Sequence, residues 1–463
     1  MQGTKENKMG IMPVNKLLLS MSVPIMISMI VQALYNIIDS IYVAQLSENA
    51  LSAVSLAFPI QNLIIAVATG TGVGVSAILS RALGAKDYER ANKAAGNSLV
   101  LVIFSWVVIA LIGLVFSKPI IAAQITQSTD SAEIVEMGTQ YLQIVSMVSI
   151  GVYGEIAFER LLQSTGRTVL SMVVQLVGAV INIILDPILI FGRYGFPELG
   201  VAGAAWATVI GQIIAMLIAV VLHFTLNKEI RIKLRHFIPD FKLIGKIYLI
   251  GIPSILMVAI GSVMNFLLNK ILSSFTTTAV AVFGAYFKLQ SFVFMPVFGL
   301  NNGMVPIIAF NYGALNMERI KKTIKLAMIY AVVMMLIGFA VFQLFPDGLL
   351  NFFEASEEMN KIGSVALRTL SFSFLTAGMS VVSSSVFQAF GKSIYSFIVS
   401  FARQLVLLIP IAYLMSLTGN LNLVWTAFPI AEMLCCILCL VFLVKILKNV
   451  KQTIDKKREA VVE

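Results

Sequence analysis

Twelve runs of apolar residues, each long enough to cross a membrane, follow one another along this chain. A helix that spans about 30 Å of hydrocarbon needs about 20 predominantly apolar residues. We therefore predict an all-α polytopic membrane protein in which each run forms one of 12 transmembrane helices. The approximate runs are 17–44, 51–80, 94–116, 134–163, 167–192, 198–226, 243–273, 279–312, 323–345, 362–390, 393–418 and 420–447.

The composition excludes a soluble, nucleic-acid-binding protein. Hydrophobic residues make up 59% of the chain and charged residues only 12%, whereas soluble domains carry about 25% charged residues. The net charge of +10 comes from short basic clusters between the apolar runs, which is typical of membrane proteins. We expect a multi-pass protein of the cell (inner or plasma) membrane that contacts the lipid bilayer, binds no nucleic acid and is a monomer.

The basic residues also predict the orientation. If the N-terminus is cytoplasmic, the segments on the inner side hold 26 of the 33 Lys and Arg residues and the outer segments hold four. Cytoplasmic loops of membrane proteins carry an excess of Lys and Arg. Both termini are therefore predicted to be cytoplasmic.

The chain repeats itself at a spacing of 229 residues, which places Pro24 on Pro253 and GAKDYER (84–90) on GALNMER (313–319). An even number of helices per repeat inserts both halves the same way up, which gives parallel repeats with the transport path between them. We predict two pseudo-symmetric six-helix bundles. The predicted parts are an N-terminal lobe (1–226), a basic cytoplasmic linker (227–242), a C-terminal lobe (243–447) and a cytoplasmic tail (448–463).

Three polar groups in the first half are predicted to share one depth in the outer half of the membrane. At about 1.5 Å per residue, Asp39 lies about 9 Å deep, Asp186 about 10 Å and Thr208 about 15 Å. Asn182 is four residues from Asp186 and shares its helix face. Pro187 cannot donate a backbone hydrogen bond, so it interrupts the helical bonding and frees the carbonyl of Ile183.

This polar set is absent from the second half, where the matched positions are Leu268, Leu407, Ile411 and Ala427. The scaffold is thus duplicated and the polar set is not. One interpretation is that these groups only hold helices together by hydrogen bonds. The other, which we favour because ionisable groups inside membranes are usually functional, is a site for a proton or a small hard cation such as Na⁺. Its residues are Asp39, Asn182, Asp186 and Thr208.

Other intramembrane charges have competing interpretations. Glu155 contacts a cationic drug or faces a watery inner cavity. Glu159 and Arg160 lie at the inner end of the same run and are expected at the surface. Arg403 and Glu432 reach similar depths and are expected to form a structural ion pair, because an unpaired charge there is costly.

Several segments together carry a resemblance to a known family. They are Pro24 with YNIIDSIYV (35–43), GAKDYERA (84–91), LQSTGR (162–167), NIILDPILIF (182–191), GAAWATVIGQ (203–212) and MPVFGLNNGMVPIIAFNYGA (295–314). Through them the chain resembles, over nearly its whole length, the multidrug and toxic compound extrusion (MATE) transporters, particularly the DNA-damage-inducible-protein branch of prokaryotes. The resemblance implies two six-helix lobes that export organic cations and amphipathic drugs in exchange for H⁺ or Na⁺, with no other cofactor. It assigns the cation site to the same four residues and makes Pro24 the point at which the first helix bends.

The sequence supports three other functions less well. A nucleotide-driven pump would need G-x-x-x-x-G-K-S, but Val386 stands where GKS at 391–393 would require glycine. An intramembrane aspartyl protease would carry GxGD, and Ile38 and Leu185 precede the two aspartates. A lipid-linked oligosaccharide flippase of related two-lobe architecture remains the alternative, although we would expect more intramembrane Arg and Lys to meet a pyrophosphate. We expect a transporter rather than an enzyme.

Overall fold

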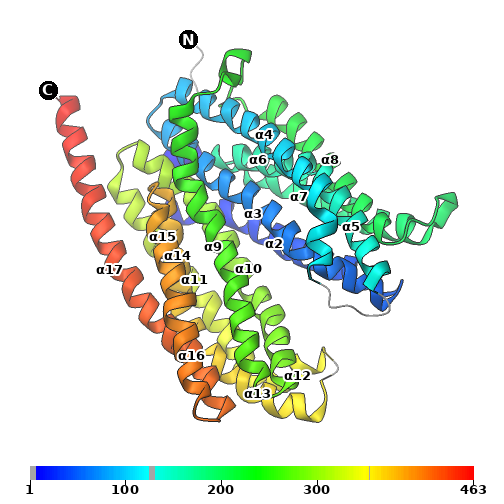
Figure 1. The fold of residues 1–463 in the computed structure, drawn as a ribbon. Coiled ribbons are helices and arrows are strands. Elements are labelled where there is room, and N and C mark those ends of the chain that lie inside the picture. The colour runs from blue at the N-terminus through cyan, green and yellow to red at the C-terminus, as the bar shows by residue number, and fades with distance from the viewer. Residues whose placement is uncertain (1–6, 125–130, 354, 463) are drawn as a thin grey trace. The chain divides into compact units, whose positions relative to one another are not determined.

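A computed structural model describes residues 7–124, 131–353 and 355–462, and every regular element in these ranges is a helix (Figure 1). Residues 1–6, 125–130, 354 and 463, among them Lys5 of the predicted inner segments, lie outside the description. The elements are α1 (Lys8–Ile11), α2 (Val14–Ala44), α3 (Glu48–Gly84), α4 (Tyr88–Ala122), α5 (Ser131–Met147), α6 (Ile150–Ser164), α7 (Thr168–Phe191), η1 (Arg193–Gly195), α8 (Val201–Leu226), η2 (Leu234–Phe237), α9 (Phe241–Ser273), α10 (Thr277–Gly313), α11 (Met317–Leu344), α12 (Pro346–Asn351), α13 (Glu357–Ser371), α14 (Phe374–Ala389), α15 (Ser393–Phe401), η3 (Ala402–Leu408), α16 (Ile409–Ser416) and α17 (Leu421–Val462).

The helices agree with the predicted fold class. In the described part of the chain, 10 helices are long and apolar enough to cross a membrane, and two bent helix pairs raise the number of spans to 12. The all-α, multi-span prediction is confirmed. The side of the membrane on which the termini lie stays a prediction.

Two runs that were predicted as single helices are bent in the structure. Run 134–163 forms α5 and α6, which meet at 44°, and run 362–390 forms α13 and α14, which meet at 50°. Polar side chains donate hydrogen bonds to two backbone carbonyls at the first break. Ser149 Oγ donates to the Ser146 carbonyl at 2.7 Å, and Trp106 Nε1 donates to the Met147 carbonyl at 2.8 Å. These bonds compensate for the interrupted helix, which lipid would leave unsatisfied.

Prolines do not interrupt the helices that contain them. α2 continues through Pro24, α7 through Pro187 and α9 through Pro253. The predicted break beside Asp186 is therefore wrong in one respect, because α7 extends four residues beyond Pro187 to Phe191. Whether α2 bends at Pro24 stays a prediction.

The described chain forms two compact units. One contains Met1–Met26 and Leu256–Glu463, and the other contains Ile27–Ile255. The chain passes between units inside α2 and α9, in each case two residues after a proline of the repeat, Pro24 or Pro253. The division into lobes at the basic linker stays a prediction.

The two repeat loops have the same local structure. Lys86 and Leu315, which are 229 positions apart, adopt left-handed φ angles of 58° and 57°. The next residue caps the following helix in each loop: Asp87 accepts from the Arg90 amide at 3.0 Å, and Asn316 accepts from the Arg319 amide at 3.1 Å. The matching sequence segments thus encode matching turns.

In each unit, a side chain on the helix after the repeat loop also holds the segment that leads into a long helix. In the unit Ile27–Ile255, Asn97 of α4 accepts from the Asp240 amide at 2.8 Å and donates to the His236 carbonyl at 3.1 Å. In the other unit, Arg319 of α11 donates to the carbonyls of Met9 at 3.0 Å and Met12 at 2.8 Å. The linker before α9 and the segment before α2 are therefore held in place rather than loosely tethered.

Candidate functional site

Three of the four predicted site residues meet between α7 and α8. Asn182 Nδ2 lies 3.4 Å from Asp186 Oδ1 on its own helix and 3.4 Å from Thr208 Oγ1 on α8. All three side chains are buried, and Asp186 has no exposed surface. The i, i+4 spacing of Asn182 and Asp186 gives them one face of α7, and Thr208 completes the cluster from the facing helix.

Close packing of the two helices brings this cluster together. A Cβ atom built on Gly211 of α8 would lie only 2.9 Å from the carbonyl oxygen of Gly178 on α7, and 3.5 Å from Asn182 Cβ. Any larger residue at Gly211 would push the helices apart. The glycine in GAAWATVIGQ therefore sets the distance at which Thr208 faces Asn182.

Asp39 of α2 adjoins this cluster. Its carboxylate is half-buried and lies close enough to Asp186 for the two charges to repel each other. Tyr35 lies one helical turn before Asp39, close enough for the charges of both aspartates to act on its hydroxyl. The structure thus brings Asp39 to the side of the α7–α8 cluster.

Oxygens in this cluster remain available for a ligand. Asp39 Oδ1, Asn182 Oδ1 and Asp186 Oδ2 are buried and have no hydrogen-bond partner among the described residues. Buried polar atoms in proteins are nearly always bonded, so three orphan oxygens in one place need an explanation. Carboxylate, amide and hydroxyl oxygens are the ligands that small hard cations prefer, and a carboxylate oxygen is equally a proton acceptor. The donor set fits Na⁺ or H⁺.

A cavity extends from this cluster into the unit Ile27–Ile255. Its wall mixes apolar side chains with hydroxyl, amide and carboxylate groups from five helices. The lining residues are Ser28, Gln32, Tyr35, Ile65, Val152, Glu155, Ile156, Glu159, Gln175, Gly178, Ala179, Asn182, Thr208 and Gln212.

Both acids of α6 line this cavity. Glu155 lies against α7, where a Cβ on Gly178 would be 3.7 Å from its Oε1. Glu159 was expected at the surface, and that prediction is wrong: only 4% of the residue is exposed, and its Oε2 accepts a hydrogen bond of 2.9 Å from Gln175 Nε2. Gln175 of α7 covers Glu159, which sequence position alone did not indicate.

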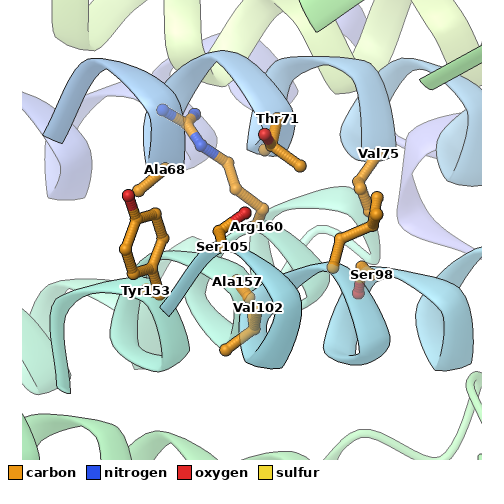
Figure 2. Close-up of a pocket in the computed structure, with 11 residues that line it drawn as sticks. Ala68, Thr71, Val75, Ser98, Val102, Ser105, Tyr153, Ala157 and Arg160 are labelled. Carbon is orange, nitrogen blue, oxygen red and sulfur yellow. The ribbon is translucent and has the colours of Figure 1, made fainter. Parts of the chain in front are cut away.

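Arg160, which follows Glu159, lines a different cavity between α3, α4 and α6. Figure 2 shows its guanidinium and the Tyr153 hydroxyl directed toward α3. Gly72 makes room for this side chain, because a Cβ there would lie 2.8 Å from Arg160 Cγ. Arg160 Nη1 donates to Gln163 Oε1 at 3.0 Å. The positive charge of α6 therefore lies outside the cavity that holds the two acids.

Arg403 and Glu432 are in contact in the other unit. Arg403 Nη1 donates to Glu432 Oε2 at 3.2 Å. Arg403 belongs to η3, a π-helical stretch between α15 and α16. Such widened turns displace side chains along a helix and often occur at functional positions.

Several residues that line the cavity were not singled out from the sequence. Tyr35, Gln175 and Gln212 contribute polar atoms to it. A weak signal existed for Tyr35, since it precedes Asp39 by four residues and shares its face of α2. Gln175 and Gln212 carry no such signal, because their role depends on how α7 and α8 pack against α6.

Comparisons with known proteins agree with this architecture. The sequence model of the MatE family matches residues 24–188 and 253–414. The chain is 29% identical over 442 residues, 95% of each chain, to the multidrug export protein MepA of Staphylococcus haemolyticus. It is 28% identical over 426 residues to MepA of Staphylococcus aureus (strain MSSA476), which covers 91% of this chain and 92% of that relative.

Solved structures give the same result. The fold matches an outward-facing multidrug resistance MATE family transporter of the MOP superfamily with a TM-score of 0.91 and 27% identity, over 98% of this chain and 100% of that one. It matches a MOP superfamily transporter from Pyrococcus furiosus with a TM-score of 0.90 and 27% identity, over 97% of this chain and 100% of that one. With both halves of the chain matched, this protein belongs to the MATE family of membrane transporters.

Proposed function

We propose that this transporter exports multiple drugs, among them organic cations and amphipathic compounds, out of the cell in exchange for H⁺ or Na⁺. The MepA relatives are named as multidrug export proteins, and they align over more than nine tenths of the chain. The observation that carries the ion-exchange part is the group of orphan oxygens of Asp39, Asn182 and Asp186 beside a cavity lined by α2, α3, α6, α7 and α8.

The coupling ion binds at Asp39, Asn182, Asp186 and Thr208. Two carboxylates that interact in a poorly solvated lobe cannot both be ionised easily without a compensating cation. A proton on one carboxylate satisfies this need, and so does Na⁺ held by both carboxylates, the Asn182 amide oxygen and the Thr208 hydroxyl. The backbone carbonyl of Ile183 on α7 is a further ligand, because Pro187 has no N–H group to donate to it.

Ion binding is coupled to drug release through α2. This helix carries Asp39 at the ion site and also lines the cavity with Gln32 and Tyr35. An ion that draws Asp39 toward Asp186 therefore moves the cavity-lining side chains that lie after Pro24 on the same helix. In our mechanism Pro24 lets α2 bend in response, which lowers the affinity of the cavity for the drug.

The charge of the cavity favours this function over the export of a lipid pyrophosphate. Its lining contains two carboxylates, Glu155 and Glu159, and no Lys or Arg. A pyrophosphate needs basic partners. Arg160 and Arg403, the two arginines noted among the charges of the apolar runs, do not line this cavity.

Ethidium accumulation in energised cells tests the proposed function. Cells that express the wild-type protein should accumulate less ethidium than cells with an empty vector. Asp39→Asn and Asp186→Asn should restore accumulation to the empty-vector level. Asp455→Asn, at an exposed position of α17, serves as the matched control and should behave as wild type. Full efflux by both site variants would contradict ion coupling at this site.

A further inference from the structure

We propose that Glu155 and Glu159 form a second charged site in the cavity, which receives the positive charge of a monovalent organic cation. This inference rests on the proposed export function and names the part of the cavity that recognises one class of cargo. The site is distinct from the ion cluster at Asp39 and Asp186. Its core is the pair of carboxylates on α6 together with Gln175 on α7.

The two carboxylates face the same space. Glu155 and Glu159 are four residues apart on α6, which places them on one helix face, one turn from each other. Both line the cavity, and both lie against α7, Glu155 beside Gly178 and Glu159 at Gln175. A ligand in the cavity can therefore meet both side chains at once.

One oxygen of this pair has no partner. Glu159 is 4% exposed, its Oε2 accepts from Gln175, and its Oε1 is buried without a hydrogen-bond partner among the described residues. A buried carboxylate oxygen without a partner is costly. A donor or a positive charge in the cavity would remove this cost. The hydrogen bond from Gln175 fixes the carboxylate in the orientation that leaves Oε1 for the ligand.

The charge balance indicates a single positive charge on the ligand. Arg160 follows Glu159 and interacts with it electrostatically. Its side chain lines the smaller cavity, between α3, α4 and α6 (Figure 2). Two carboxylates one turn apart in a poorly solvated cavity are not easily ionised together without compensating positive charges. Arg160 supplies one of these charges, and a monovalent cation in the cavity would supply the other.

The lining of the cavity favours an organic cation over a bare metal ion. Apolar side chains of Ile65, Val152 and Ile156 lie beside the acids, with the Tyr35 ring on α2. Aromatic faces attract organic cations, and apolar walls bind their hydrocarbon parts.

The acid pair is separated from the ion site along the cavity. Gln175, which bonds to Glu159, precedes Asn182 by seven residues on α7, or about 10 Å at 1.5 Å per residue. The cavity touches both positions. Drug and coupling ion can therefore occupy the cavity at different places, and each place can be altered separately.

Equilibrium dialysis on the full-length purified protein tests this inference with a charged and a neutral aryl phosphorus probe. Tetraphenylphosphonium carries one positive charge, and triphenylphosphine oxide carries none. We expect Glu155→Gln and Glu159→Gln each to weaken tetraphenylphosphonium binding about tenfold, which corresponds to about 1.4 kcal/mol. Binding of the neutral probe should stay within about twofold of wild type, since a factor of two is about 0.4 kcal/mol. Glu136→Gln, at an exposed position of α5, is the matched control and should change neither.

A further variant separates the outcomes. Glu159→Asp keeps the charge and should retain more tetraphenylphosphonium affinity than Glu159→Gln. If both glutamine variants bind this probe with wild-type affinity, the inference is wrong while the export function stands. Na⁺ competition gives another outcome. If Na⁺ displaces tetraphenylphosphonium from the wild type but not from Glu155→Gln, the acid pair binds an inorganic ion and the inference is likewise wrong. Wild-type protein that binds neither probe contradicts the proposed function as well.

Should a glutamine variant fail to give monodisperse protein, the other single variant decides the question by the same measurement. Wild-type affinity in that variant overturns the inference, and a loss of about tenfold that is restricted to the charged probe supports it.

Discussion

Asn182 and Thr208 face each other across α7 and α8, with Asn182 Nδ2 3.4 Å from Thr208 Oγ1, although 26 residues separate them in the chain. This contact exists because Gly178 and Gly211 let the two helices approach. The arrangement leaves Asn182 Oδ1 without a partner. A packing feature of small residues thus shapes the candidate ion site.

The first prediction concerns that helix contact. Gly211→Ala should destabilise the protein by about 1–3 kcal/mol, because the added Cβ meets the Gly178 carbonyl of the facing backbone. Gly245→Ala on α9 is the control, since a Cβ there has open space among the described residues. It should be neutral or stabilising by up to about 1 kcal/mol. Thermal unfolding in detergent measures both, and equal effects would contradict the packing argument.

The second prediction concerns Arg403 and Glu432. Arg403→Gln and Glu432→Gln should each destabilise the protein by about 3 kcal/mol, since each leaves a poorly solvated charge without its partner. The double variant should lose less than the sum of the two single losses. Arg403→Gln combined with Glu358→Gln, an exposed position of α13, should be additive. Unfolding of the purified variants gives the coupling, and strict additivity in the first pair would mean that the two residues do not interact.

The third prediction concerns the linker before α9. Asn97 bonds to the backbone of His236 and Asp240, so Asn97→Ala should release this segment. Trypsin should then cut the linker faster at its basic residues, because proteases cleave transiently opened chain. Asn449→Ala, at an exposed position of α17, is the control. An unchanged cleavage rate in Asn97→Ala would show that the linker is held by other contacts.

The fourth prediction concerns orientation. A cysteine placed at Asn420, between α16 and α17, should react with a membrane-impermeant thiol reagent in intact cells. The excess of Lys and Arg lies in the segments on the other side of the membrane and predicts that side to be cytoplasmic, so Asn420 should face the outside. A cysteine at Lys457, an exposed position of α17, should be protected until the cells are opened. The three native cysteines are buried and should give a low background. The reverse pattern would invert the topology.

The sequence predicted the helices well because lipid imposes a simple rule on them. A backbone in hydrocarbon must satisfy its own hydrogen bonds, so length and hydropathy are nearly sufficient to find a span. The bends after Met147 and Ser371 could not be found this way. Neither SMVS (146–149) nor LSFS (370–373) contains glycine or proline, and serine hydroxyls bond to nearby carbonyls at both places.

The site was only partly predictable. Acids in apolar runs are conspicuous, so Asp39 and Asp186 could be singled out, and helical spacing linked Asn182 to them. Glu159 was placed at the surface because it lies near the end of its run. Its burial depends on Gln175 from the next helix, and no rule of spacing within one helix predicts a contact between two helices.

The most direct test of the exchange mechanism measures ethidium release from the purified protein. Acidification, or addition of Na⁺ at constant pH, should release bound ethidium from the wild type, because the ion occupies the orphan oxygens and moves α2. Asp39→Asn and Asp186→Asn should bind ethidium but release less of it, and the double variant should release none in response to either ion. Unchanged ion-triggered release in the double variant would contradict the account.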